Sequence, residues 1–358
     1  MILNRFYDPN TPKVAAVVLF YMAAALIMVF VNKAVLNNSP SLPLLFLLNQ
    51  MLIAVLLLHA SAFVSTRIEI PKFELATAKK LFAVVAVNAI GLVFNTLCLR
   101  DVEASFFQIA RGLVLPLTII VSCLNTRTSP SLRTIIAAIL VTLGFLVGVA
   151  PSSALPKASA PSIISLVYGI LSSLFIAFHA VLIKSSLPHC HNSTIQLAYW
   201  TNAGTALLLA PFVVFAGELA NLQGLIYEST WDGRVFMWGS LMTGVFGFLL
   251  CVAGLLSIQV TSPITHMFSS AGKSVLQTVL GVVIYEDIMT VNRMSSISII
   301  TLGAMYYTWV KSAESTPSPR KDIDLEAMRE RQILQNDGDN DEAAVIFSIE
   351  EKKGEDKT

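Results

Sequence analysis

Long apolar runs constrain this 358-residue chain more than any other feature. A helix needs about 20 apolar residues to cross a bilayer core, because lipid offers no partner for backbone N–H and C=O groups. About ten such runs follow one another: Val14–Val31, Leu42–Val64, Leu81–Leu99, Ala104–Leu124, Thr134–Val149, Ile163–Ile183, Ile195–Ala216, Val235–Val260, Pro263–Tyr285 and Met294–Val310. The pattern predicts an all-α membrane protein with about ten transmembrane helices.

The amount and placement of charge agree with a bilayer environment. Charged residues make up 13% of the chain, whereas soluble domains carry about 25%. Residues 312–358 hold 13 acidic and 7 basic side chains, which leaves 10 acidic and 17 basic among residues 1–311. The basic residues lie between apolar runs rather than on one polar face, so we expect no nucleic-acid partner. The polar tail has too few apolar groups to bury a core, and we expect it to be disordered.

Lysine and arginine in the loops indicate an orientation. Cytoplasmic loops of membrane proteins carry an excess of these residues. With a cytosolic N-terminus, ten of them fall on the cytosolic side and five on the other. We therefore predict a cytosolic segment 1–13, a transporter-like membrane domain 14–311 with halves at about 14–150 and 161–311, and a cytosolic tail 312–358.

Neither a metal site nor an enzyme centre is evident. The cysteines Cys98, Cys123, Cys190 and Cys251 form no C-x-x-C pair, and the histidines lack ligand spacing. The sequence also lacks a glycine-rich phosphate loop, a nucleophile elbow and paired carboxylates within the apolar runs. We expect no cofactor and no catalytic activity.

Two cations in mid-run are the strongest functional signal. Arg111 and Lys273 are flanked by uncharged residues, and a cation at the centre of a spanning helix costs at least about 2.5–3.5 kcal/mol. No Asp or Glu lies in mid-run to pair with either. Facing an interior cavity, they would form an anion site suited to phosphate. The alternative is that they extend to the interface or bond neighbouring carbonyls.

Polar residues accompany Lys273 on its helix. His266, Ser269, Ser270 and Lys273 have i, i+3, i+4, i+7 spacing and so share one helical face. Gly272 would allow close backbone approach. This stripe is suited to lining a cavity, although hydrogen bonding between helices would also account for it.

Other polar residues could also face a cavity. Tyr199-Trp200-Thr201-Asn202 combines aromatic rings with an amide, which is a general way to hold a nucleobase, or it marks an aromatic belt at the interface. Lys33 ends the first run and Asn95 lies in the third. Each could line a cavity, and helix packing is the simpler interpretation.

The two halves carry a faint repeat. The stretches that begin at Arg111 and Lys273 both read basic, small, apolar, apolar, and they lie five helices apart. Five spans per half would invert one half relative to the other, as in transporters with a midplane site. Gly144 and Gly148 have the spacing of a dimer face, although packing within one chain explains them more simply.

Five stretches resemble the nucleotide-sugar transporter and triose-phosphate translocator branch of the drug/metabolite transporter superfamily, and most closely the GDP-fucose transporters. They are Val31–Lys33, Phe94–Leu113, Gly217–Leu222, Thr261–Asp287 and Tyr307–Val310. The resemblance implies two inverted five-helix halves in a Golgi or endoplasmic reticulum membrane, and exchange of a cytosolic nucleotide sugar for a luminal nucleoside monophosphate. It also implies that Arg111 and Lys273 bind the substrate.

Two motifs depart from the pattern of the GDP-sugar carriers. Where those have two aromatic residues and two asparagines, this chain has Tyr199-Trp200-Thr201-Asn202. The glycine of the lysine motif is shifted to Gly272. Alternatives are therefore a carrier of UDP-xylose, UDP-galactofuranose or GDP-mannose, a sugar-phosphate translocator, and a non-transporting membrane scaffold.

Overall fold

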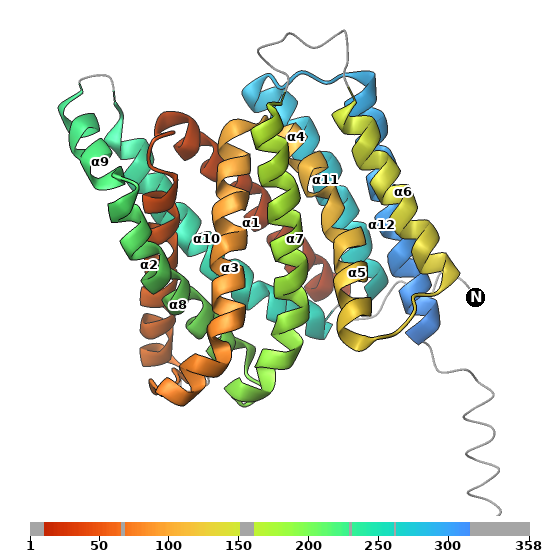
Figure 1. The fold of residues 1–358 in the computed structure, drawn as a ribbon, viewed down its shortest axis with the longest axis horizontal. Coiled ribbons are helices and arrows are strands. Elements are labelled where there is room, and N and C mark those ends of the chain that lie inside the picture. Colours follow the sequence, from red (N-terminus) through yellow and green to blue (C-terminus); the bar gives the residue numbers. More distant parts are fainter. Residues whose placement is uncertain (1–10, 66–68, 151–160, 229–230, 261–262, 316–358) are drawn as a thin grey trace, which may run out of the picture. The chain divides into compact units, whose positions relative to one another are not determined.

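The computed structural model describes residues 11–65, 69–150, 161–228, 231–260 and 263–315, with side-chain surroundings except at 11–18, 251–271 and 315. Within these ranges every regular element is a helix (Figure 1). The α-helices are α1 (Thr11–Asn38), α2 (Pro43–Val64), α3 (Leu75–Asp101), α4 (Ala104–Ala110), α5 (Val114–Thr126), α6 (Leu132–Val149), α7 (Ile163–Ser186), α8 (Thr194–Phe215), α9 (Glu218–Tyr227), α10 (Gly233–Val260), α11 (Pro263–Tyr285) and α12 (Val291–Ser315).

Each of the ten predicted runs forms helix, and most helices extend beyond the apolar run by a few residues. Polar residues at the ends continue the helix into the interface and supply its caps. The hydroxyls of Ser131, Ser162 and Ser193, for example, accept hydrogen bonds from the backbone N–H three residues later. Hydropathy marks the part of a helix within the bilayer core, so it underestimates the length of the helix.

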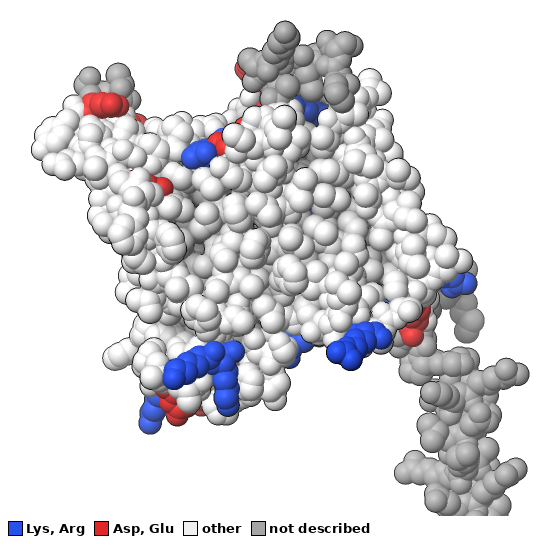
Figure 2. Space-filling view, viewed as in Figure 1, with Lys and Arg blue, Asp and Glu red and all other residues white. Residues whose placement is uncertain are grey.

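Among the described residues, eight helical segments are long and apolar enough to cross a membrane, and α4 and α5 together form one of them. Figure 2 shows charged side chains at two opposite ends of this face, with uncharged residues between them. Many large apolar side chains on the outside of the bundle are exposed, including Leu56, Phe63 and Leu207. In water such a surface would aggregate, whereas in lipid it is the expected outer face of a transmembrane bundle.

The helices pack in a few extensive pairs. α3 packs along α7, and α1 packs along α10. α2 lies between α8 and α10, α3 also contacts α8, and α5 contacts α7. α11 contacts both α1 and α4. Segments far apart in the sequence thus form the interior of the bundle.

Helix α9 was not predicted, and its first residue holds it against α2. The Glu218 carboxylate accepts hydrogen bonds from the Leu44 and Leu45 backbone N–H groups, at 3.0 and 2.7 Å. These N–H groups lie in the first turn of α2, where a helix has no internal acceptors for them. Burial raises the pKa of the Glu218 carboxyl, and the hydrogen bonds from Leu45 and Leu44 oppose that shift.

Gly144 and Gly148 are used within the chain. A Cβ atom on Gly144 would lie 2.9 Å from the Ile300 side chain, and one on Gly148 would collide with Ser296. Gly303 of α12 faces Val141 of α6 in the same way. Small residues therefore bring α6 and α12 close together. Packing within one chain, which we preferred for Gly144 and Gly148, is the role that the structure gives them, and the alternative of a dimer face gains no support.

The last described helix continues past its predicted end. α12 runs to Ser315, five residues beyond Val310. The first ten residues and residues 316–358 lie outside the described residues, so the predicted N-terminal segment and the disordered tail stay predictions.

Candidate anion-binding site

The fourth span breaks at the arginine singled out in the sequence. α4 ends at Ala110, a 3₁₀ turn covers Arg111–Leu113, and α5 begins at Val114. Pro116 explains the break, because it has no N–H to donate to the Gly112 carbonyl four residues earlier and its ring crowds that carbonyl. The single continuous helix that we expected over Ala104–Leu124 is wrong at this point. The break places Arg111 at a turn in the middle of the span.

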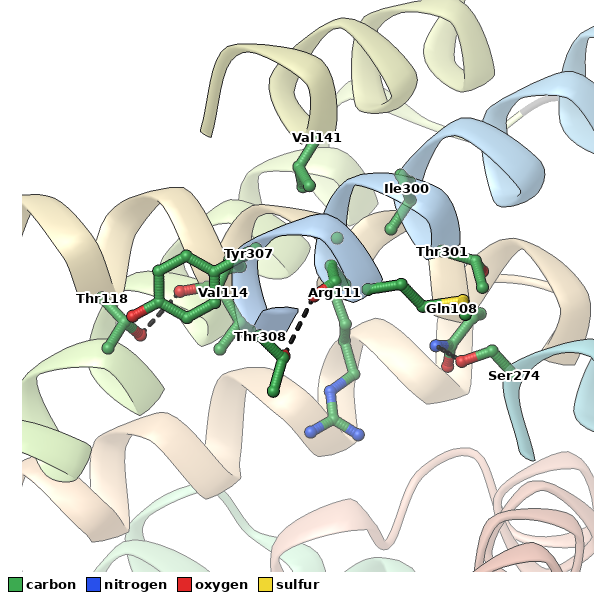
Figure 3. A pocket seen from close by; sticks show the side chains of 14 residues that line it. Gln108, Arg111, Val114, Thr118, Val141, Ser274, Ile300, Thr301, Tyr307 and Thr308 are labelled. Carbon is green, nitrogen blue, oxygen red and sulfur yellow. Dashed lines mark hydrogen bonds between the residues drawn. The ribbon is translucent and has the colours of Figure 1, made fainter. Parts of the chain in front are cut away.

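The Arg111 side chain lies beside an interior cavity of about 400 Å³. Its guanidinium group lies over the Phe107 ring, 5.5 Å from the ring centre. Figure 3 shows the guanidinium directed away from the α12 side of the cavity, with no dashed contact to the side chains drawn. No carboxylate in the described part of the chain forms an ion pair with Arg111. An unneutralised guanidinium beside a cavity is suited to binding an anion.

Lys273 lies near Arg111. The Gln108 side-chain amide donates a hydrogen bond of 2.7 Å to the Ser274 hydroxyl, which joins α4 to α11 beside both cations (Figure 3). The charges of Lys273 and Arg111 are close enough to repel each other. Lys273 also forms no ion pair with the described carboxylates. Two like charges held together in a membrane interior are most stable when an anion lies between them.

A second, smaller cavity of about 190 Å³ lies between α3 and α7, and Arg111 lines this one too. Its polar groups come from Asn88, Asn95 and His179. The Asn88 amide donates to the Thr205 hydroxyl at 3.1 Å, and the Asn95 carbonyl oxygen accepts from the Ser172 hydroxyl at 3.4 Å. Asn95 therefore lines the same cavity as Arg111.

The Tyr199–Asn202 segment has other contacts. Tyr199 lies edge-on to the His59 ring at 5.3 Å, and the buried Trp200 packs near Phe73. The Thr201 hydroxyl and the Asn202 amide donate to carbonyls of their own helix α8. In this conformation the Thr201 hydroxyl proton and one amide N–H of Asn202 are used within α8, whereas the Asn202 carbonyl oxygen makes no hydrogen bond among the described residues.

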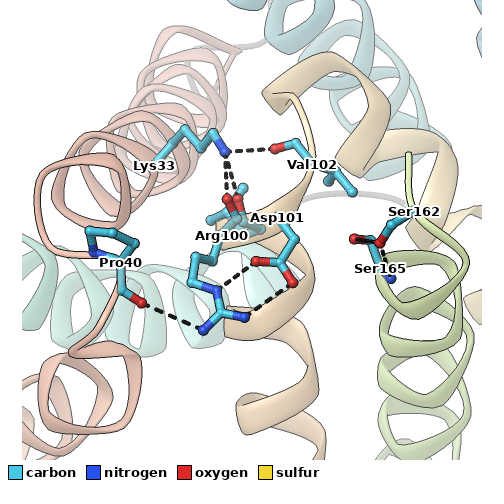
Figure 4. A network of polar contacts seen from close by, with 8 residues as sticks. Lys33, Pro40, Arg100, Asp101, Val102, Ser162 and Ser165 are labelled. Carbon is cyan, nitrogen blue, oxygen red and sulfur yellow. Dashed lines mark hydrogen bonds and ion pairs between the residues drawn. The ribbon is translucent and has the colours of Figure 1, made fainter. Parts of the chain in front are cut away.

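Lys33 is also fully occupied. Its ammonium group donates to the carbonyls of Leu99, Arg100 and Val102 at 2.9, 3.0 and 2.7 Å (Figure 4). An ammonium has three protons, and these contacts use all three. Lys33 therefore satisfies the last carbonyls at the C-terminal end of α3, a favourable place for a cation. This contact supports a structural role, and we leave Lys33 out of the site.

The remaining predicted residues lie on α11. Gly272 is exposed, and a Cβ atom there would lie 3.5 Å from the Met22 side chain of α1. The side chains of His266, Ser269 and Ser270 lie outside the described residues, so the polar stripe stays a prediction.

Polar contacts join several elements at one end of the bundle. Glu103, which precedes α4, forms an ion pair with the buried Arg293 of α12. Asp287 accepts a 2.7 Å hydrogen bond from the Ser105 N–H, and Gln277 donates to the Ala104 carbonyl. Together with the Lys33 contacts, these interactions lie where α3 ends and α12 begins, at the upper end in Figure 1.

The sequence contained a signal for some residues that we did not predict. Gln108 lies three residues before Arg111 and therefore on the same helical face. Asn88 lies seven residues before Asn95, two turns along one face of α3. Ser274 and His179 had no comparable signal, because only the tertiary structure brings them to the cavities.

The helices and the two neighbouring cations define a multi-span membrane protein with a cation beside a cavity. The sequence matches the Triose-phosphate Transporter family over residues 13–308, and the chain belongs to that family. This confirms the predicted branch and makes the protein a membrane transporter.

Named relatives agree with the family match. GDP-fucose transporter 1 of Dictyostelium discoideum is 28% identical over 304 residues, which cover 82% of this chain and 80% of the relative. GDP-fucose transporter 1 of Mus musculus is 28% identical and covers 87% and 86%. One solved crystal structure, 13% identical, matches with a TM-score of 0.52 over 84% of this chain and 99% of its own. That likeness supports the fold alone.

Proposed function

We propose that this protein is a nucleotide-sugar antiporter that brings GDP-fucose into the Golgi lumen in exchange for GMP. The single observation that carries the proposal is a pair of neighbouring cations: Arg111, which lines a cavity, and Lys273, which lies near Arg111. A nucleotide sugar carries a diphosphate, and a guanidinium fork with an ammonium group matches its charge. The names of the relatives support the nucleotide sugar as the ligand.

The helix contacts support ten spans in two inverted halves. We count α4 and α5 as one span and treat α9 as a side helix. When each span is replaced by the one five positions along the chain, the α3–α7 contact becomes the α10–α1 contact, and the α2–α10 contact becomes the α8–α3 contact. All four contacts are present in the structure. The same replacement exchanges α2 with α8 and α4 with α11, so these two contacts each correspond to themselves. Five is odd, so the second half would run in the opposite direction to the first.

We expect both termini to be cytosolic. Figure 2 shows several Lys and Arg side chains along the lower edge, where Figure 1 places the connections α2–α3, α5–α6 and α7–α8. This asymmetry matches the positive-inside rule. Protease added to sealed Golgi vesicles should remove an epitope placed at Thr358. A protected epitope would reverse the orientation.

The base is the least constrained part of the ligand. The groups of Thr201 and Asn202 bond to their own helix, and Thr201 stands where GDP-sugar carriers have asparagine. A UDP-sugar carrier is therefore the second candidate. Either ligand would place its phosphates at Arg111 and Lys273.

Counterflow in proteoliposomes tests the proposal. Vesicles preloaded with GMP should take up labelled GMP and GDP-fucose, and vesicles preloaded with UMP should take up much less. Unlabelled nucleotides added outside should compete in the same order. Efficient exchange of UMP without GMP would assign the protein to the UDP-sugar carriers, and no exchange of any nucleotide would reject the proposal.

A further inference from the structure

The cavity between α3 and α7 contains polar groups that the fold leaves without partners. His179 Nε2 is shielded from solvent and has no hydrogen-bond partner among the described residues. The side chains of Asn88 and Asn95 are half-buried, and the Asn88 carbonyl oxygen and the Asn95 amide N–H groups make no hydrogen bond among the described residues, because the bonds to Thr205 and Ser172 use the other atom of each side chain. A buried polar group without a partner is costly, especially at membrane depth.

These groups are arranged around a space that a ligand could fill. The cavity of about 190 Å³ is lined by Asn88 and Asn95 on one face of α3 and by Phe175 and His179 on α7. A single water needs only about 10–15 Å³ of such volume, so the space is much larger than one water. An aromatic ring, two amides and an imidazole are the groups that proteins use to stack on a base and read its edge.

Arg111 fixes how a ligand would lie. It lines both cavities, so an anion bound to it lies at the opening of the smaller one. The smaller cavity contains no other charged side chain, which favours the uncharged part of a nucleotide there. The larger cavity extends from Arg111 toward Ser274 and α12, and leaves room for the sugar.

On the basis of the proposed function, we propose that the nucleotide base binds between α3 and α7, where Asn88, Asn95 and His179 read its edge. The phosphates bind at Arg111 and Lys273. The base is thus read mainly on α3 and α7.

The test compares ligands with and without a base. Exchange of labelled GMP is measured in proteoliposomes with unlabelled GMP, UMP or ribose 5-phosphate as competitor, for wild type, His179→Ala, His179→Gln and Asn95→Ala. We expect the alanine variants to bind GMP about tenfold more weakly and the ratio of GMP to UMP affinity to approach one. Competition by ribose 5-phosphate should not change, because it has no base. His179→Gln keeps a hydrogen-bonding group and should fall between wild type and His179→Ala.

The control is His189→Gln, because His189 is exposed just beyond the end of α7. It should behave as wild type. Unchanged GMP and UMP competition in all three cavity variants would overturn the base site. An equal loss for GMP and ribose 5-phosphate would also overturn it, because that loss is structural. With GDP-fucose and GDP as two further competitors, a loss confined to GDP-fucose would also overturn it, because the sugar and not the base would then lie there. Failure of the proposed function is distinct, because the wild-type protein would then exchange no nucleotide.

Discussion

Replacing Lys273 or Arg111 by alanine should lower nucleotide exchange at least about tenfold while the protein still folds. A hydrogen bond to a charged group contributes roughly 1.5–3 kcal/mol, and about 1.4 kcal/mol corresponds to a factor of ten. Folding should be retained, because neither cation pairs with a described carboxylate and because removing a cation from mid-membrane relieves an insertion cost. Exchange in proteoliposomes and a thermal melt in detergent measure the two effects separately.

Lys273→Arg should restore only part of the activity, since a planar fork and a compact ammonium place their protons differently. Lys184→Ala is the matched control, because Lys184 is an exposed cation in the last turn of α7. Its exchange rate should equal that of wild type. Wild-type exchange in either alanine variant would show that the cation concerned has a structural role.

Glu103→Ala should destabilise the protein strongly. Its partner Arg293 is 1% exposed, so the variant leaves a buried guanidinium without its carboxylate. Breaking a buried pair from one side costs roughly 3–5 kcal/mol, and we expect a loss below that range because the Glu103 side chain is 23% exposed. A lower unfolding midpoint in detergent, measured by differential scanning fluorimetry, checks this.

The adjacent pair Arg100–Asp101 provides the control. Its side chains are 27% and 26% exposed, and such pairs contribute about 0.2–1 kcal/mol. Asp101→Ala should therefore change the midpoint little. The double variant Glu103→Ala/Arg293→Met should recover stability relative to Glu103→Ala, because no buried charge remains. Equal losses for Glu103→Ala and Asp101→Ala would contradict the assignment of a buried ion pair.

The positions of the spans were predictable, because the bilayer imposes a length and a hydropathy on each helix. Helix α9 was not predicted, because it is short and mixes apolar with polar residues. Its position also depends on a contact between Glu218 and the N-terminus of α2, more than 170 residues away in the sequence. The break at Arg111 was in principle readable from Pro116. We did not use that signal, since apolar composition continues through the break.

The candidate site was predictable in part. Arg111 and Lys273 stood out because charge within an apolar run is rare, and the structure brings them close together. Lys33 looked similar, yet its three acceptors come from the end of α3, and sequence alone does not show that contact. Thr201 and Asn202 could bond either a ligand or their own helix. The side-chain rotamer decides whether these groups bond a ligand or their own helix, and the residue type does not determine the rotamer.

Helix α12 contacts both the polar cluster at one end of the bundle and the turn that carries Arg111. Near its start, Arg293 is held by Glu103, and two turns later Ile300 lies so close to Gly112 that an added Cβ would be only 2.7 Å away. Gly112 directly follows Arg111 in the 3₁₀ turn. A packed helix moves as a unit. A movement of α12 that releases Arg293 from Glu103 therefore also displaces the 3₁₀ turn. Separation of the helices at that end would therefore also move Arg111, and an anion bound at Arg111 would in turn affect that separation.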